Sequence, residues 1–328
     1  MITKSAIDDF TLFLRHACQF NADSSNFSYW KIGGPVSLLV EPNSVEELAL
    51  SIKLLHIHNG VPSLVVGDGS NLLYDSRGFN GILIKVGNSI SDIRIEGTRV
   101  TCEAGLWVPE LTYRLSGFGL SGIEHVCGIP GRLGGLIYMN GGTNRRSILD
   151  NVVSVELINK NGEIEVEYIE NLTFGYRSSP FQNEKRVIAR VTLDLVQSTR
   201  KKVRTEIRRI LASRRERFPR NYPNCGSVFL SDPKMYSTVG APGFAIEQAG
   251  LKGVCKGGAQ ISTQHANFIV NKGKATSEDV LYLINLIRIT VFKQTGFFMD
   301  CEVRYVAPCG NIMPAHIESD KRWNNLNV

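Results

Sequence analysis

The sequence predicts an α+β protein built from two or three domains. The chain has 328 residues, which is too long for one ordinary core and suits domains of roughly 100 residues or a little more. Near its start, a strand, a helix and a second strand follow one another at 37–40, 44–58 and 63–66. From Lys201, a charged helix opens a segment that ends in a long helix, and we expect this segment to form a separate α+β domain.

The other elements are predicted in chain order from hydrophobic periodicity and turn residues. Ser44 caps the first helix, with Glu47 three residues later as in a capping box. A second block then contains strands at 82–86, 93–95 and 99–104, a helix at 108–117, glycine-rich turns at 128–142, and strands at 152–158, 163–168 and 187–195. The last block contains the helix from Lys201 to Pro219, the loop "NYPNCGSVF" and a helix at 277–295.

Composition indicates a folded globular protein and argues against nucleic-acid binding. The hydrophobic fraction of 43% and the charged fraction of 21% are typical of globular proteins. The net charge of +6 is spread along the chain and is densest from Lys201 to Arg220. A diffuse excess of this size favours an anionic substrate or a solvated face over nucleic-acid binding.

Cysteine spacing and the first residues indicate the compartment. The seven cysteines form no CxxC pair and no cluster with metal-ligand spacing, so we expect free thiols and no metal site. The start "MITKSAIDDFTLFL" has acidic residues where a signal peptide needs an apolar stretch. No apolar run approaches the ~20 residues that cross a bilayer. We therefore expect a cytoplasmic protein without membrane contact.

Two glycine-containing turns are candidates for binding a phosphate-bearing cofactor. In "VVGDGSNLL", an apolar run ends in Gly67, Asp68, Gly69, Ser70 and Asn71, where several backbone N–H groups could face one anion. An ordinary tight turn explains the same residues. In Cys127–Gly142, six glycines fall within sixteen residues, which indicates either a large ligand against bare main chain or a mobile lid. The pattern differs from G-x-G-x-x-G, which argues against a Rossmann site.

Three side chains in separate motifs could carry the chemistry. Arg177 in "FGYRSSPF" lies among aromatic and small residues, where it is either a fixed carboxylate-binding fork or a residue reaching solvent. Ser227 in "NCGSVF" could donate a proton, and its spacing excludes the G-x-S-x-G elbow. Glu302 in "FFMDCEVRYV" is expected inside an apolar strand, as a proton carrier or as a half-buried partner of a neighbouring charge.

A sixth segment, 243–273, is predicted as a helix with two glycine turns followed by a strand. The strand would carry Gln264, His265, Asn267 and Asn271, which suit a sugar or uridine ring. A structural role for His265 is the alternative.

Taken in order, these segments resemble the UDP-N-acetylenolpyruvoylglucosamine reductase (MurB) family. The resemblance runs from "KIGGP" at Lys31 through "GDGSNLL", "GIPGRLGG", "YMN", "FGYRSSPF", "NCGSVF", "EQAGLKG", "GGAQIS" and "HANFIVN" to "EVR" at Glu302. It covers about nine tenths of the chain in the correct order, which is far more specific than any one motif. The chain lacks a long insertion between "YR" and the serine loop, as in the shorter type of the family.

The resemblance implies a fold and a domain arrangement. The fold is the FAD-binding fold of the vanillyl-alcohol-oxidase (PCMH) type, with two α+β subdomains and a C-terminal α+β substrate-binding domain. The boundaries are 1–86 for the first subdomain, with a C-terminal return at about 303–328, then 87–198 for the second and 199–302 for the substrate-binding domain.

The resemblance also implies an activity and its residues. The family reduces the enolpyruvyl group of UDP-N-acetylglucosamine enolpyruvate to UDP-N-acetylmuramate, a peptidoglycan precursor, with FAD and NADPH. Ser227 would protonate C2, and Arg177 and Glu302 would polarise the carboxylate. The substrate-binding candidates are Tyr176, Arg214, Asn224, Gln264 and His265. The cofactor-binding candidates are Gly67, Asp68, Gly69, Ser70, Asn71, Leu72, Gly128, Ile129, Pro130, Gly131, Gly134, Gly135, Tyr138, Asn140 and Gly141.

Several segments depart from the family pattern. They are the loops at 141–146, 217–219 and 229–233 and the tail from Pro308 to Val328. The altered loops support one alternative, a related flavin oxidoreductase acting on a different sugar nucleotide. A second alternative is a flavin-dependent oxidase of the same fold. We expect noncovalent FAD, because no His or Cys occupies an evident attachment position, and a monomer or weak dimer.

Overall fold

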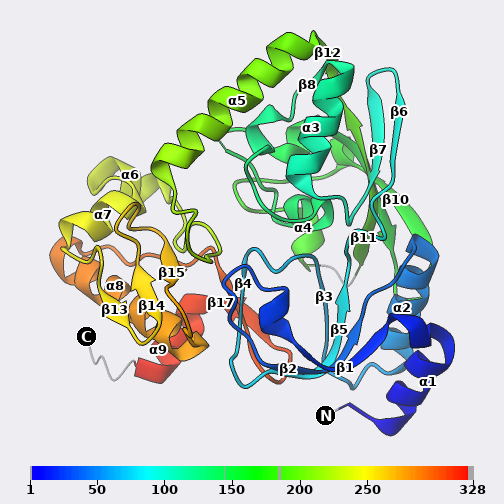
Figure 1. Cartoon of the computed structure of the whole chain (residues 1–328), viewed down its shortest axis with the longest axis horizontal. Helices are drawn as coiled ribbons and strands as arrows, with labels where there is room; N and C mark the ends of the chain where they lie inside the picture. The colour runs from blue at the N-terminus through cyan, green and yellow to red at the C-terminus, as the bar shows by residue number, and fades with distance from the viewer. Residues whose placement is uncertain (1, 144, 184–185, 324–328) are drawn as a thin grey trace. The chain divides into compact units, whose positions relative to one another are not determined.

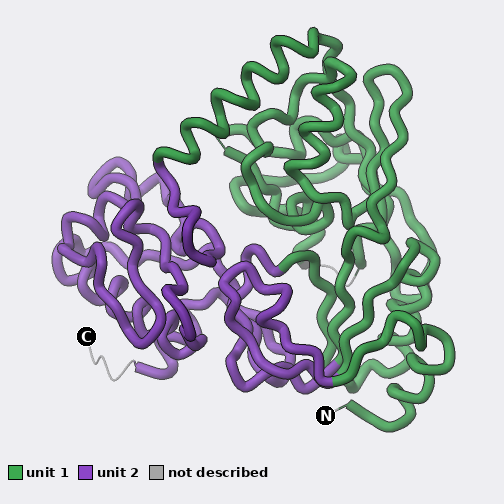
Figure 2. Tube along the Cα trace, in the orientation of Figure 1, with its two compact units in different colours: residues 1–20, 38–68, 82–216 green, residues 21–37, 69–81, 217–328 purple. Residues whose placement is uncertain are grey.

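The computed structural model of the chain describes residues 2–143, 145–183 and 186–323. Asn144 of the altered loop and 324–328 of the tail lie outside the described residues. The chain divides into two compact units (Figure 2). Unit 1 contains 1–20, 38–68 and 82–216, and unit 2 contains 21–37, 69–81 and 217–328.

The first sheet has four strands and carries the helix that the sequence predicts at 44–58. Its strand order is β1 (Cys18–Asp23), β2 (Pro35–Val40), β5 (Phe79–Lys85) and β3 (Ser63–Val66). The connecting helix α2 (Val45–Ile57) begins at Ser44, whose side chain accepts the N–H of Glu47 at 3.2 Å. Because β3 pairs parallel to β5, a crossover must join them, as in other α/β units.

The second sheet of unit 1 has five strands, and its described pairings are antiparallel. Its strand order is β10 (Ile164–Tyr168), β9 (Val152–Ile158), β11 (Val187–Asp194), β7 (Arg99–Glu103) and β6 (Ile93–Glu96). The helices of this region are α3 (Val108–Phe118) and α4 (Leu133–Tyr138). Buried side chains of this sheet and of the first sheet form one continuous apolar core.

Unit 1 ends in the long charged helix α5 (Arg200–Arg217), labelled in Figure 1. It follows β12 (Val196–Gln197), which pairs with β8 (Leu120–Ser121). Val203, Ile207 and Ile210 are the buried residues of α5, and they form a small cluster with Cys127. Their spacing defines one apolar face, so the charged side chains occupy the rest of the helix surface.

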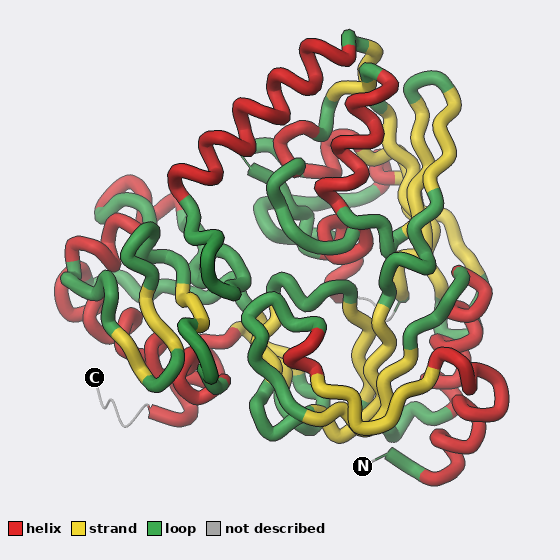
Figure 3. Tube along the Cα trace, in the orientation of Figure 1, coloured by secondary structure: helices red, strands yellow, loops and turns green. Residues whose placement is uncertain are grey.

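The described residues of unit 2 contain two small sheets and several helices; Figure 3 colours strands yellow and helices red. One sheet contains β17 (Ile312–Pro314), β16 (Arg304–Val306) and β4 (Leu72–Tyr74), and the other contains β13 (Cys255–Lys256), β14 (Ala259–Ile261) and β15 (Ile269–Asn271). The helices are α6 (Pro233–Thr238), α7 (Pro242–Gln248), α8 (Ser277–Thr295) and α9 (Ala315–Trp323). Trp30, fully buried, donates its indole N–H to the carbonyl of Ile269 at 2.7 Å.

The structure corrects two predicted strands and adds elements that the sequence did not reveal. Glu302 lies in a bend just before β16, and Gln264 and His265 lie in the loop between β14 and β15. In both segments, the backbone N–H and C=O groups form hydrogen bonds with loops, described below, in place of strand pairing. The helices α1 (Lys4–Leu14), α4 and α9 were not predicted. In the described part of the chain, no helix combines the length and apolar character needed to span a membrane.

Candidate active site

The turn after β3 is shaped in unit 1 by Arg132, a residue that the sequence analysis did not single out. Arg132 donates from Nε to the Asp68 carboxylate at 2.8 Å and from Nη1 to the Gly105 carbonyl at 2.9 Å. Its Cγ would lie 2.9 Å from a Cβ added to Gly67. Gly67 therefore makes room for the arginine, and Asp68 is engaged in a largely buried ion pair.

The rest of this turn, in unit 2, leaves three consecutive backbone donors available. Gly69 has a φ of +61°, a conformation that favours glycine. No hydrogen bond among the described residues uses the N–H of Gly69, Ser70 or Asn71 as donor. Adjacent free N–H groups in a turn can bind one anion, as phosphate-binding nests do. Leu72 follows as the first residue of β4.

Most glycines of the 128–142 segment accommodate other parts of the protein. A Cβ on Gly128 would lie 2.4 Å from Cδ and Nε of Arg214, and one on Gly141 would lie 2.3 Å from Leu136. A Cβ on Gly134 would meet Ala104 at 3.0 Å. Gly135 differs, because its added Cβ would meet no atom within 4 Å. Chain packing thus explains Gly128, Gly134 and Gly141, whereas it does not explain Gly135.

The loop with Arg177 is fastened to the end of this glycine-rich segment. Gly175 and Ser178 exchange two backbone hydrogen bonds of 3.0 Å, and Arg177 between them has a φ of 54°. Asn140 donates to the Gly175 carbonyl at 2.7 Å, and the Tyr138 carbonyl accepts from Ser179 at 2.7 Å. A non-glycine residue in this left-handed conformation is uncommon and is often found at functional sites.

The guanidinium of Arg177 is placed by two neighbours in unit 1. It lies 5.3 Å from the ring centroid of Tyr176 and donates to the Gly142 carbonyl at 3.3 Å. Tyr176 itself is 60% exposed, so its ring is available to a ligand. Arg177 is therefore a cation held beside the glycine-rich segment.

The serine loop is anchored in unit 2 to the turn at 69–72. The buried thiol of Cys225 lies 3.7 Å and 3.5 Å from the carbonyl oxygens of Gly69 and Leu72. Asn224 donates to the Pro219 and Tyr222 carbonyls and accepts the N–H of Gly226 at 3.0 Å. Burial raises the pKa of the Cys225 thiol far above its usual range, so this group stays protonated as a donor.

Ser227 and Glu302 are neighbours although 75 positions separate them in the sequence. The N–H of Glu302 donates to the Val228 carbonyl at 2.8 Å, and Phe229 forms a bridge with Cys301. Asn71 donates from its side chain to the Glu302 carbonyl at 3.2 Å. Both Ser227 and Glu302 are partly exposed. The candidate proton donor and the candidate carboxyl group therefore lie on adjoining backbone segments, beside the turn at 69–72.

The loop between β14 and β15 supports the serine loop. Asn267 is buried, accepts the Phe229 N–H at 2.9 Å and donates to the Phe229 carbonyl at 3.0 Å. His265 accepts the Asn267 N–H on Nδ1 at 3.2 Å, and burial lowers the pKa of its ring. Asn271 donates to the Trp30 carbonyl at 2.9 Å. The side chains of both asparagines thus form hydrogen bonds with the protein's own backbone. In the sequence, both lie in the segment "HANFIVN".

The structure groups the predicted residues by unit. Unit 2 brings together Asn71, Asn224, Ser227 and Glu302, with Gln264 and His265 in the β14–β15 loop. Unit 1 brings Arg177 and Tyr176 to the glycine-rich segment, and Arg214 of α5 packs on Gly128. Ile129, Pro130 and Gly131 precede α4 in unit 1.

Two family models match this chain. The FAD binding domain model matches residues 36–166, and the model for the C-terminal domain of UDP-N-acetylenolpyruvoylglucosamine reductase matches residues 218–306. These matches confirm the FAD-binding fold with a second, C-terminal α+β domain that the resemblance implied.

Similar proteins cover nearly the whole chain. A protein named UDP-N-acetylenolpyruvoylglucosamine reductase 1 from Corynebacterium glutamicum is 44% identical over 92% of this chain and 90% of its own length. The reductase from Carboxydothermus hydrogenoformans is 41% identical over 86% of this chain and 92% of its own length. The crystal structure of the Thermus caldophilus reductase has a TM-score of 0.74, is 28% identical, and covers 87% of this chain and 97% of that chain.

Proposed function

This chain belongs to the UDP-N-acetylenolpyruvoylglucosamine reductase family, and on that premise we propose that it converts UDP-N-acetylglucosamine enolpyruvate to UDP-N-acetylmuramate. FAD is the bound cofactor and NADPH the hydride donor in this proposal. The observation that carries it is the 2.8 Å hydrogen bond from Glu302 N–H to the carbonyl of Val228, which places Ser227 and Glu302 on adjoining backbone segments. A proton donor and a carboxyl group on adjoining segments are what protonation of an enolpyruvyl carbon needs.

Each unit contains a feature that suits part of a noncovalently held FAD. In unit 1, the open space at Gly135 leaves room for a flat ring against the backbone. In unit 2, the N–H groups of Gly69, Ser70 and Asn71 suit a pyrophosphate. When bound, FAD would accept a hydride from NADPH and deliver it to the substrate's carbon–carbon double bond. Asp68 would act indirectly, through the ion pair that fixes Arg132 at the turn.

The chain's own side chains would handle the charge and the proton. Ser227 Oγ would donate its proton to C2 of the enolpyruvyl group, while the hydride adds to C3. Negative charge develops next to the substrate carboxylate as the hydride arrives, and the guanidinium of Arg177 would stabilise it. One well-placed donor in a closed site is typically worth ~3 kcal/mol. Glu302 would act with Arg177 to polarise the substrate carboxylate.

The sugar-nucleotide contacts are proposed with one revision. Tyr176, Arg214 and Gln264 remain candidates through their side chains. Asn224 and the Nδ1 atom of His265 are already engaged in loop hydrogen bonds, so Asn224 would act by shaping the loop and His265 through Nε2. This division follows because Nδ2 of Asn224 already donates two hydrogen bonds, and Nδ1 of a neutral imidazole accepts only one.

Steady-state assays separate the proposal from its alternatives. We expect NADPH oxidation to depend on UDP-N-acetylglucosamine enolpyruvate and to yield one UDP-N-acetylmuramate per NADPH, measured by absorbance and mass spectrometry. A related reductase would instead prefer another enolpyruvyl sugar nucleotide in the same assay. An oxidase would consume NADPH and oxygen at full rate without any sugar nucleotide.

A further inference from the structure

The C-terminal tail extends beyond the segment that the family model matches, which ends at 306. Within the described residues it forms β17 and α9. Both elements belong to unit 2, and β17 pairs antiparallel with β16, directly after the Glu302 bend. Its described residues therefore belong to the unit that carries Ser227 and Glu302.

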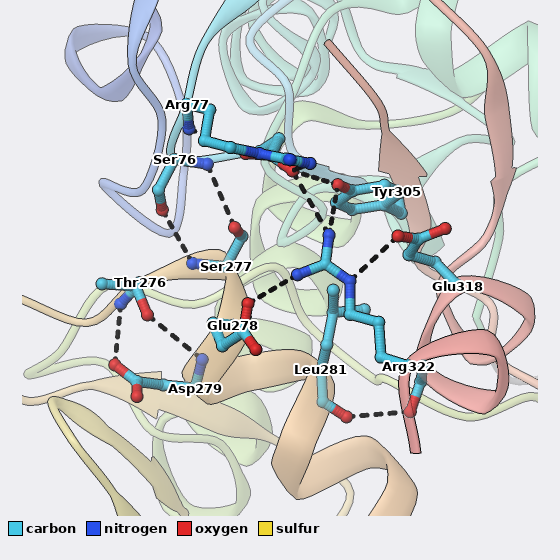
Figure 4. Close-up of polar contacts among 12 residues, drawn as sticks. Ser76, Arg77, Thr276, Ser277, Glu278, Asp279, Leu281, Tyr305, Glu318 and Arg322 are labelled. Carbon is cyan, nitrogen blue, oxygen red and sulfur yellow. Dashed lines mark hydrogen bonds and ion pairs between the residues drawn. The ribbon is translucent and has the colours of Figure 1, made fainter. Parts of the chain in front are cut away.

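Helix α9 is docked on α8 by polar contacts. Ser319, fully buried, donates to the Leu281 carbonyl at 2.9 Å. Arg322 lies between Glu318, Glu278 and Tyr305, as Figure 4 shows, at 2.9, 2.6 and 2.9 Å from their oxygen atoms. Because several of these groups are poorly exposed and joined in one network, they fix the helix more firmly than isolated surface pairs would.

The first two residues of α9 hold the backbone on both sides of Glu302. The N–H of Cys301 donates to Nδ1 of His316 at 2.9 Å. The N–H of Ala315 donates to the Val303 carbonyl at 2.9 Å. The backbone immediately before and after Glu302 is thus tied to a segment outside the matched family domain.

A second arginine, Arg288, also connects α9 to the segment that precedes Glu302. Arg288 of α8 donates from Nε to the Met299 carbonyl at 2.8 Å and pairs with Asp320 of α9. The Arg288 side chain is only 8% exposed. It therefore joins three pieces of structure, namely α8, α9 and the segment that leads to Glu302.

The hydrogen bond from Cys301 defines the state of the His316 ring. Nδ1 accepts the hydrogen bond from the Cys301 N–H, so the neutral ring carries its own proton on Nε2, which lies 3.4 Å from the Asp300 carboxylate. A protonated ring could not accept from Cys301. Burial and the charge of Arg288 lower the pKa of His316, while Asp300 and Asp320 act in the opposite direction.

From this geometry we propose that His316 is a positioning residue, which holds the segment 299–303 in the conformation that presents Glu302 to the substrate. The inference rests on the role of Glu302 in the proposed function. It predicts that the tail contributes to turnover without touching the substrate, because errors of about 1 Å in a reacting group can lower a rate about 100-fold.

The test compares His316→Ala with His316→Asn in the full chain carrying FAD. The Asn Oδ1 atom takes the place of Nδ1 and can accept from Cys301, so it should restore what Ala removes. We expect His316→Ala to lower kcat about 10- to 100-fold with KM changed little, and His316→Asn to recover most of the loss. Ser319→Ala is the matched control, because it weakens α9 docking away from Glu302. Its melting temperature should fall while its kcat stays at the wild-type value.

The Glu302→Gln variant distinguishes failure of this inference from failure of the proposed function. If both hold, Glu302→Gln lowers kcat, and adding His316→Ala lowers it little further, since the two changes act through one group. A wild-type kcat in Glu302→Gln would remove Glu302 from the proposed function. Amide hydrogen exchange of 299–303 would then show whether His316 holds the segment. Unchanged kcat and exchange in His316→Ala, or an equal loss of kcat in Ser319→Ala, would overturn the positioning role.

Discussion

Ser227 owes its position to residues that do no chemistry themselves. Before Ser227, the Cys225 thiol contacts the carbonyl oxygen of Gly69. After it, the side chain of Asn267 forms hydrogen bonds with both the N–H and the carbonyl of Phe229. The loop is therefore fixed at both ends, and the hydroxyl between them is partly exposed. This arrangement suits a proton donor that must meet its substrate at one defined place.

Replacing Ser227 by Ala should remove the proton donor and little else. We expect the rate at which reduced protein converts the enolpyruvyl substrate to fall by about 10²- to 10⁴-fold. Reduction of the bound cofactor by NADPH should keep its wild-type rate, because the serine takes no part in it. Stopped-flow absorbance measures both half-reactions, and equal slowing of the two would refute proton donation by Ser227.

His125 is a buried histidine whose charge state should affect stability. It is 2% exposed, and burial, followed by the charge of Arg146, lowers its pKa from 6.5 to about 4. The unfolded chain binds a proton at this residue below pH 6.5, whereas the folded chain does so only near pH 4. Stability from this residue is therefore complete above pH 6.5 and falls as the pH drops toward 4.

The variant His125→Leu should lose this part of the pH dependence. We expect its free energy of unfolding, measured in urea between pH 7 and pH 4, to fall less steeply than that of the wild type. Between pH 7 and pH 4, the free energy of unfolding of the wild type should fall by at most about 3 kcal/mol more than that of the variant. Parallel curves for the two proteins would mean that His125 titrates normally in the folded state.

From the sequence, candidate reactive residues were easier to select than the residues that hold them in place. The motifs led to Arg177, Ser227 and Glu302, because unusual side chains in glycine-rich or aromatic surroundings can be recognised from the sequence alone. Glu302 was placed in a strand because apolar residues surround it, but its backbone bonds go to Val228 and Asn71. Arg132 was overlooked, since only folding shows that Gly67 and Asp68 face it.

At the scale of elements, unit 2 is held together by a buried carboxylate between three segments. Asp75 is 2% exposed and binds Arg77 through two hydrogen bonds to its guanidinium, at 3.0 and 2.8 Å, and Tyr305 through its hydroxyl. The adjacent Ser76 exchanges hydrogen bonds with Ser277 at the start of α8, as Figure 4 shows. The segment around β4 is thereby connected to both α8 and β16.

Asp75→Asn should destabilise the protein at neutral pH. Burial alone raises the pKa of Asp75, but the hydrogen bonds from Arg77 and Tyr305 outweigh it and hold the pKa at about 2, below the ordinary 3.8. The carboxylate's contribution is therefore present above pH 3.8 and is lost as the pH falls toward 2. We expect the variant to lose about 2 kcal/mol at pH 7 in urea unfolding. A loss that stays constant down to pH 3 would contradict this origin.

Elements with a strong periodic pattern were predicted, whereas elements fixed by tertiary contacts were not. The helices α2, α3, α5 and α8 lie where periodicity and caps placed them. α9 was missed because its sequence "AHIESDKRW" has no apolar stripe and docks through ion pairs. α4 lies in a glycine-rich segment that discourages a helix assignment. α1 did have a signal, since Thr3 caps a helix with Ala6, Phe10 and Leu14 buried on one face.

At the scale of the whole molecule, each unit has its own apolar core. The core of unit 1 joins both of its sheets, and a second core in unit 2 contains Trp30, Phe229 and Tyr305. We propose the division that the resemblance implies, with a first FAD-binding subdomain at 1–86 and about 303–328, a second at 87–198 and a substrate-binding domain at 199–302. The compact units follow other boundaries, because 21–37, 69–81 and 303–328 belong to unit 2 and 199–216 belongs to unit 1. Limited proteolysis at the proposed boundaries can test this division.

The account depends most on one claim, that the protein's reduced cofactor gives its electrons to an enolpyruvyl sugar nucleotide. The direct measurement is anaerobic stopped-flow mixing of the NADPH-reduced protein with UDP-N-acetylglucosamine enolpyruvate. We predict that the yellow absorbance of oxidised flavin returns within the mixing experiment and that UDP-N-acetylmuramate forms in equal amount. A protein that stays reduced after mixing, or that binds no flavin at all, would contradict the account.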